Sequence, residues 1–262
     1  MRYEKKYVVT RLGDEMIKYF ESLEYYSYEN MDGYERNYFM DGDILIELDI
    51  YQNESELILL TAKSNENNLE EFVPKQQRGS LKKGLVEVTN CPRYQSPETI
   101  FENIKPFKVV VEGPKGSGKS TVIRFLVKKG VNCRDRDQEV FSNDKIIGFN
   151  LDTRADFWKE RIHRNPNEYF LLLTCSKEVL EERLSRRTIE GSGYTYEHEV
   201  YQNAYEETYD YLKREHELHH KLYKMNNSNL PIRVQKRFAM ETIEKMEEHY
   251  HRQKTHQKRI QK

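Results

Sequence analysis

The chain has 262 residues, and its 43 Lys and Arg side chains almost balance its 44 Asp and Glu side chains, for a formal net charge of -1. This balance excludes a wholly basic or wholly acidic protein, and the length indicates one or two domains. A hydrophobic content of 37%, with 19 Tyr and 11 Phe, excludes a disordered chain. The longest apolar run, at 169–173, is too short to span a membrane, and the first residues form no hydrophobic signal segment. We therefore expect a cytoplasmic protein with no membrane partner.

Charge divides the chain into two parts. Residues 1–106 contain 13 basic and 20 acidic side chains, whereas residues 107–262 contain 30 basic and 24 acidic ones. Such an asymmetry favours two units with different surroundings, the second suited to phosphate-bearing partners. We therefore expect a small acidic α+β domain of unknown role at 1–106 and a second domain at 107–262 that ends in a basic tail.

The first part shows short apolar patterns separated by polar turns. At 43–51 apolar and polar residues alternate, which predicts a strand with one face on a core. Residues 64–83 are polar and predict a long loop. The other patterns predict strands at 6–10, 56–62 and 84–90, a helix at 14–25, and a short helix that begins at Ser96-Pro97.

The second part opens with the strongest motif in the chain. The β-branched run at 107–112, FKVVVE, predicts a buried parallel strand, and GPKGSGKST follows it directly. This matches GxxxxGK[ST], and the apolar spacing from Val122 to Val127 predicts the helix that must come next. Strand, glycine loop and helix in this order predict a phosphate-binding loop formed by Gly113, Pro114, Lys115, Gly116, Ser117, Gly118, Lys119, Ser120 and Thr121.

Each residue type in this motif has a chemical reason. Glycines let the backbone curl so that peptide N–H groups and the helix N-terminus point at phosphate. Lys119 is a point charge for the β- and γ-phosphates of ATP, and the Ser120 hydroxyl is a ligand for Mg²⁺. The cofactors that the motif implies are therefore ATP and Mg²⁺.

Carboxylates follow two of the next predicted strands. The stretch at 131–137, VNCRDRD, places Asp135 and Asp137 at the end of a second strand, where ligands bind in open α/β sheets. Either carboxylate is a candidate general base for an acceptor hydroxyl or an outer ligand of Mg²⁺, and Arg136 beside them is a candidate substrate contact.

A third predicted strand at 145–150 runs into Leu151-Asp152-Thr153-Arg154. Asp152 therefore competes with Asp135 and Asp137 for the carboxylate role, although it would also serve as a helix N-cap. Arg154 is a candidate for holding an acceptor phosphate.

The clearest buried strand, at 169–176, precedes a helix rich in arginine. A Gly-Ser-Gly sequence at 191–193 then predicts a hinge, so residues 183–198 form a candidate lid. Arg183 and Arg187 are candidates for neutralising charge on the transferred phosphoryl group, and Arg186 for contacting the nucleotide. The alternative is that these arginines only complement the helix dipole.

These motifs together resemble the P-loop nucleoside and nucleotide kinases. VVVEGPKGSGKST looks like the first strand and phosphate loop of thymidylate kinases, YFLLLTCSKEVLEERLSRR is similar to their later strand and lid helix, and EVYQNAYEETYDYL to their post-lid helix. The short segment between the phosphate-loop helix and the later strand is closer to polynucleotide 5′-hydroxyl kinases. The resemblance covers 107–212 and implies a P-loop type parallel sheet flanked by helices, closed by a strand at 230–234 and a helix at 238–250.

Three functions remain open from the sequence. The first is an Mg²⁺- and ATP-dependent kinase of a nucleoside or nucleotide, similar to thymidylate kinase. The second is a kinase that acts on a 5′-hydroxyl or modified base in nucleic acid, which would explain the basic tail after Glu248. The third is an NTP-binding switch or ATPase that phosphorylates no acceptor.

Overall fold

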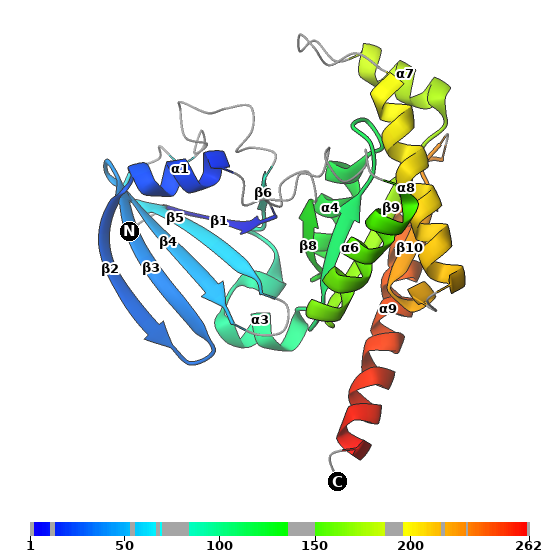
Figure 1. Ribbon diagram of the computed structural model, residues 1–262. Helices are drawn as coiled ribbons and strands as arrows, with labels where there is room; N and C mark the ends of the chain where they lie inside the picture. Colours follow the sequence, from blue (N-terminus) through cyan, green and yellow to red (C-terminus); the bar gives the residue numbers. More distant parts are fainter. Residues whose placement is uncertain are drawn as a thin grey trace. The chain divides into compact units, whose positions relative to one another are not determined.

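The computed structural model describes residues 3–10, 14–52, 56–66, 69, 84–135, 150–186, 196–215, 218–228 and 230–260 (Figure 1). Contacts divide the chain into two units, Met1–Lys108 with Leu126–Val140, and Val109–Phe125 with Phe141–Lys262. The chain is α/β: it contains an antiparallel sheet and a four-stranded parallel sheet flanked by helices. Among the described residues, no helix is long and apolar enough to cross a membrane.

The first unit is built on a six-stranded antiparallel sheet. Its strand order is β2-β3-β4-β5-β1-β6, so the first strand of the chain lies between β5 and β6. The expected strands and the Ser96-capped helix are present. The elements are β1 (Tyr3–Val9), α1 (Asp14–Ser22), β2 (Glu24–Met31), β3 (Tyr34–Asp41), β4 (Ile44–Tyr51), β5 (Ile58–Ser64), β6 (Leu85–Glu87), the 3₁₀ turn η2 (Pro92–Tyr94) and α3 (Pro97–Asn103).

Strands β2 and β3 correct the sequence analysis, which expected a helix as far as residue 25. The helix α1 ends at Ser22 because Tyr25 already pairs with Phe39 in the sheet. Two-residue turns, with Gly33 and Gly42 at φ of 81° and 60°, join β2 to β3 and β3 to β4. The turn dipeptides are Asp32-Gly33 and Gly42-Asp43, and both are hairpin signals in the sequence.

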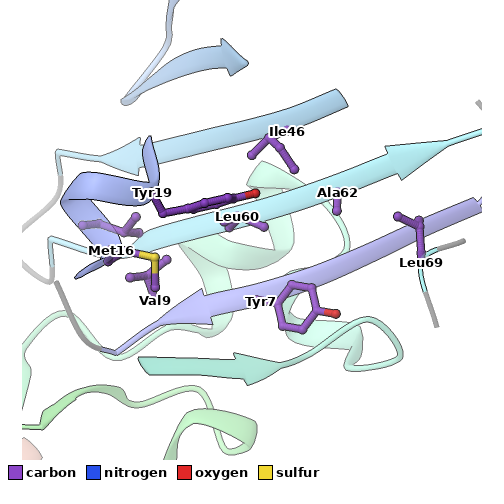
Figure 2. Packing of buried hydrophobic residues seen from close by; sticks show 9 residues of the cluster. Tyr7, Val9, Met16, Tyr19, Ile46, Leu60, Ala62 and Leu69 are labelled. Atoms are coloured by element: carbon purple, nitrogen blue, oxygen red, sulfur yellow. The ribbon is translucent and has the colours of Figure 1, made fainter. Parts of the chain in front are cut away.

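One face of this sheet is an apolar core beneath α1. Met16 and Tyr19 of α1 pack on Ile46 of β4 and Leu60 of β5, and Figure 2 shows these side chains between the helix and the strands. The alternation expected at 43–51 is confirmed, because Glu47 and Asp49 lie on the opposite face.

That opposite face is held by ion pairs. The Arg36 guanidinium on β3 binds Asp49 across the strand pair, with Nε 2.6 Å from Oδ1, and Lys63 of β5 pairs with Glu47. Only 3% of the Asp49 side chain is exposed. A carboxylate at this depth needs the paired guanidinium to offset its desolvation.

The second unit contains most of the parallel sheet, whose strand order is β10-β9-β7-β8. Strand β7 is therefore interior to the sheet and all but its first residue is buried, as the β-branched run predicted. The elements after α3 are β7 (Lys108–Glu112), α4 (Lys119–Lys128), β8 (Asn132–Asp135), α6 (Leu151–Arg164), β9 (Glu168–Thr174), α7 (Lys177–Ser185), α8 (Tyr196–Glu215), the 3₁₀ turn η4 (Leu218–His220), β10 (Leu222–Asn226) and α9 (Ile232–Ile260).

Helices α6 and α8 cover one face of this sheet. Trp158 of α6 packs edge-on against Phe170 of β9 and Tyr209 of α8, with ring centroids 4.9 and 5.9 Å apart. All three side chains are fully buried or nearly so. Edge-to-face aromatic pairs add to the free energy gained from burial, so this cluster fixes the two helices on the sheet.

The end of the chain differs from the expectation. The closing strand is β10 at Leu222–Asn226, parallel to β9, and not the expected strand at 230–234. Pro231 instead directly precedes α9, and its carbonyl accepts from the Gln235 N–H of the first helical turn. Proline has no N–H to donate to a neighbouring strand, which explains why the apolar LPIRV sequence does not form one. Helix α9 continues to Ile260, beyond the expected end at 250.

On the other face of the sheet, His249 of α9 contacts β9 and η4. Its Nδ1 lies 3.1 Å from the Tyr169 hydroxyl oxygen, and its ring stacks on His220 with centroids 4.6 Å apart. Burial, followed by the nearby positive charges of His220, Lys221, Arg252 and His219, lowers the pKa of His249 to about 4. The folded protein therefore resists protonation of this ring.

This pKa gives the fold a testable acid sensitivity. Because an unfolded histidine titrates near pH 6.5, the unfolded chain binds the proton first, and stability should fall as pH drops from about 6.5 towards 4. The variant His249→Gln cannot take up this proton, so its melting temperature should fall less over the same range. Calorimetry of both proteins at pH 7.5 and 5.0 tests this, and equal losses would contradict it.

Candidate phosphate-binding site

The site is the turn between β7 and α4. Strand β7 ends at Glu112 and α4 begins at Lys119, so six residues reverse the chain direction. Gly113, Gly116 and Gly118 have φ of 134°, 94° and 96°, values that side chains other than glycine rarely adopt. The loop therefore ends at a helix N-terminus, where free N–H groups and the helix dipole attract anions.

Two of these glycines also leave no space for a side chain. A Cβ at Gly113 would lie 2.2 Å from the carbonyl oxygen of Leu173 in β9, and one at Gly118 would lie 2.4 Å from Nδ2 of Asn227. The loop is thus packed closely against the ends of β9 and β10. A larger residue at Gly113 would have to displace the β9 backbone, and one at Gly118 would have to displace the Asn227 side chain.

The Lys119 ammonium lies inside the turn. Nζ donates to the Gly113 carbonyl at 2.7 Å and to the Pro114 carbonyl at 3.4 Å, and only 6% of the residue is exposed. The positive charge is therefore held where an anion cradled by the loop would meet it. Ser120, in the first turn of α4, is exposed.

Side chains of α7 and of the residues after β10 bind the carbonyl groups of the loop. Arg183 donates through Nη1 to the Gly116 carbonyl at 3.2 Å and through Nη2 to the Asn227 carbonyl at 2.9 Å. Asn227 is 1% exposed, and its Nδ2 donates to the Ser117 carbonyl at 2.5 Å. Two successive loop carbonyls are thus bound by side chains that do not belong to the loop.

Cys175, the residue after β9, completes this support. Its Sγ lies 3.2 Å from Nη1 of Arg183 and 3.8 Å from the Ser117 carbonyl oxygen. Its backbone is fixed by Gln202 of α8, which accepts from the Cys175 N–H and donates to its carbonyl, both at 2.9 Å. Burial raises the pKa of the Cys175 thiol although Arg183 opposes the shift, so the thiol stays neutral.

A buried carboxylate lies directly before the loop. Glu112 is 1% exposed, and its Oε2 accepts a hydrogen bond from the Tyr209 hydroxyl of α8. This contact ties the end of β7 to the helix that also carries Gln202. Tyr209 also packs on Trp158, so one side chain serves both contacts.

The structure brings only some of the expected site residues to the loop. Arg183 contacts it, whereas Arg186 caps the end of α7 at the surface and pairs with Glu182. Asp135 ends β8 as expected, is 7% exposed, and its N–H donates to the Thr10 carbonyl at 3.1 Å. Arg136, Asp137 and Arg187 lie outside the described residues.

Asp152 and Arg154 belong to a helix. The expectation that Asp152 ends a strand is wrong, because α6 begins at Leu151 and Asn150 is its N-cap, accepting from the Thr153 N–H at 2.9 Å. Asp152 lies in the first turn, where the helix dipole favours an acid. Arg154 is 8% exposed; its Nε donates to the Thr208 hydroxyl at 3.0 Å, and it pairs with Glu207, so it joins α6 to α8.

Asn227 is the site residue that the sequence analysis missed. The closing strand was expected at 230–234, which leaves Asn227 in the connection before it, whereas it directly follows β10. Placing that strand at 222–226 would have put an amide at the carboxyl edge of the sheet, where ligands bind in such folds.

These groups together suit a polyphosphate. A glycine turn with positive φ values, a helix N-terminus, the Lys119 ammonium and the Arg183 guanidinium all present positive charge at one place. Within the described ranges, no group of three or more His, Cys, Asp or Glu side chains forms a ready metal site. Mg²⁺ commonly takes one or two protein ligands and its remaining ligands from phosphate and water, so Ser120 fits that role.

Comparison with known proteins identified no matching family model, no matching curated protein and no matching solved structure.

The glycine turn gives a direct test of this geometry. Gly113→Ala adds a Cβ 2.2 Å from the Leu173 backbone carbonyl, whereas Gly116→Ala meets side-chain carbons of Leu184 and Leu180 at 3.3 and 3.5 Å. Both strain the backbone, so Gly113→Ala should lower the free energy of unfolding by about 2 kcal/mol more than Gly116→Ala. Urea unfolding followed by fluorescence of Trp158, the single tryptophan, measures both. Equal losses would show that the turn can relax away from β9.

Proposed function

We propose that the protein is an Mg²⁺- and ATP-dependent phosphotransferase of the P-loop kinase type, with a nucleoside or nucleotide as acceptor, similar to a deoxynucleoside monophosphate or thymidylate kinase. The observation that carries the proposal is the glycine turn between β7 and α4, with Lys119 inside it. The expected motif and the geometry agree in the order strand, turn and helix.

Catalysis in this proposal is mainly positioning and charge neutralisation. ATP with Mg²⁺ supplies the transferable γ-phosphoryl group. Lys119 binds the β- and γ-phosphates, Ser120 binds the metal ion, and the loop N–H groups orient the phosphate chain. Arg183 holds the Gly116 carbonyl and adds positive charge beside the loop.

The acceptor side rests on the carboxylates. Asp135, buried at the end of β8, is the proposed base for the acceptor hydroxyl, with Asp137 as the alternative. Arg154 is engaged elsewhere, since Thr208 and Glu207 bind its guanidinium.

The proposal predicts the effect of Lys119→Ala. Removing the ammonium should lower phosphoryl transfer by at least about a hundredfold because transition-state charge loses its partner. The variant should still fold, since the side chain serves the turn and not the apolar core, but loss of the two hydrogen bonds to loop carbonyls should lower the melting temperature by about 4 °C. Transfer of labelled γ-phosphate to a panel of nucleosides and nucleoside monophosphates measures the activity.

Lys129→Ala is the matched control, because this exposed lysine follows the end of α4 and leaves the loop untouched. Activity near the wild-type level in Lys119→Ala would exclude this site. Release of free phosphate without a labelled acceptor would instead favour the third function, a switch or ATPase.

A nucleic-acid acceptor is the second candidate, and the end of α9 favours it. Helix α9 runs to Ile260, and after Glu248 its sequence contains no acidic residue. Arg252 and Lys258 are exposed, with Lys254 partly exposed near the Tyr250 ring. A helical basic surface of this kind suits a phosphate backbone.

This candidate predicts a difference between two classes of acceptor. The double variant Lys254→Ala/Lys258→Ala should lower transfer to 5′-hydroxyl oligonucleotides several-fold and reduce its salt dependence, because two phosphate contacts are lost. Transfer to nucleoside monophosphates should stay the same. Equal effects on both acceptors, or none on either, would rule out a polymer-binding role for this helix.

A further inference from the structure

We infer that Asn227 is a positioning residue of the phosphate loop: its side-chain amide holds the Ser117 carbonyl so that the Gly118 N–H, in the same peptide group, faces the bound phosphate chain. The inference rests on the proposed function, because it assigns a role within the same site. Asn227 lies outside the GxxxxGK[ST] motif and about a hundred residues beyond it in sequence.

The first argument is the direction of the hydrogen bonds. Nδ2 of Asn227 donates to the Ser117 carbonyl at 2.5 Å, and Arg183 donates to the Gly116 carbonyl at 3.2 Å. A peptide group has its N–H opposite its C=O, so holding the Ser117 carbonyl turns the Gly118 N–H away from Asn227, and holding the Gly116 carbonyl turns the Ser117 N–H into the turn. The Ser117 N–H itself donates to the Pro114 carbonyl at 3.1 Å and closes the turn.

The second argument is that Asn227 is itself held firmly. Its N–H donates to the Thr174 carbonyl at 2.7 Å, and its carbonyl accepts from Arg183 at 2.9 Å. Next to it, the Ser228 hydroxyl accepts from the Ser176 N–H at 2.6 Å. Asn227 is thus fixed to the carboxyl end of β9 through its main chain, and its side chain transmits this fixed position to the loop.

The third argument is the match between Asn227 and Gly118. A Cβ at Gly118 would lie 2.4 Å from Nδ2 of Asn227, so the amide occupies the space that glycine leaves free. Burial is complete on both sides, with Ser117 at 0% and Asn227 at 1% exposure. Water therefore has no access to replace the lost donor if the amide is removed.

The experiment compares phosphate binding by the full-length wild type, Asn227→Ala and Asn227→Asp. Asparagine to alanine removes the donor, and aspartate keeps the shape but places an acceptor against the Ser117 carbonyl. Titration calorimetry in Mg²⁺ uses two probes, ATP and inorganic tripolyphosphate. Asn90→Ala, at an exposed asparagine, is the control.

We expect the dissociation constants of both probes to rise about tenfold in Asn227→Ala, by the same factor, since the loop binds phosphates and not the base. The dissociation constants should rise further in Asn227→Asp. In the transfer assay the KM for ATP should rise about tenfold while kcat changes less than about threefold, because the interaction lost is shared by ground and transition states. A purely structural role would lower apparent kcat through the folded fraction and leave KM unchanged.

The failures of the two proposals can be told apart. Wild type that binds neither probe overturns the proposed function and this inference together. Wild type that binds both, with Asn227→Ala binding them equally well and melting within about 3 °C of it, overturns the inference alone. If Asn227→Ala does not fold, probe binding and melting temperature of Asn227→Asp are compared with the wild type instead, and equal binding again overturns the inference.

Discussion

The carbonyl oxygens of Gly116 and Ser117 are bound from outside the glycine turn, by Arg183 and Asn227, and the geometry of the site depends on these bonds. A turn with three glycines at positive φ has many other conformations open to it, so glycine alone does not select one. Hydrogen bonds to buried carbonyls select one conformation, because a buried carbonyl without a hydrogen bond would cost its full desolvation free energy. The conformation that attracts an anion is therefore imposed by the ends of β9, β10 and α7.

The groups that hold the turn are themselves fixed at the ends of the buried parallel sheet. All seven residues of β9 are buried, and the strand ends where Thr174 accepts from Asn227 and where Cys175 is fixed by Gln202. Tyr209 acts at the same level by binding Glu112, the last residue of β7. The aromatic packing of Trp158 and Phe170 below then keeps α6 and α8 from shifting. Core packing and loop geometry are thus parts of one arrangement.

The sequence predicted the local structure correctly where a pattern is compatible with only one structure. The alternation at 43–51, the run at 107–112 and the glycine motif each fix the local structure, and the structure agrees with all three. The prediction failed where the same pattern occurs in more than one kind of structure. In β10 the buried residues Leu222 and Met225 lie three positions apart and so lack the two-residue period of a strand, whereas LPIRV resembles a strand but contains the proline that precedes α9. The Asn227 contact could not be predicted, because it joins residues 110 positions apart.

The division of the chain into two units limits which fragments of the protein can be stable. The first unit takes in Leu126–Val140, where the Tyr94 hydroxyl donates to the Val127 carbonyl and the Asp135 N–H donates to the Thr10 carbonyl. Helix α4 thus begins in one unit and ends in the other. A fragment that starts at residue 107 would keep the glycine turn. The end of α4 would lose its contact with Tyr94, and β8 would lose its contact with Thr10. The chain passes between the two units more than once, so no single cut separates them as it would separate modules joined by a linker.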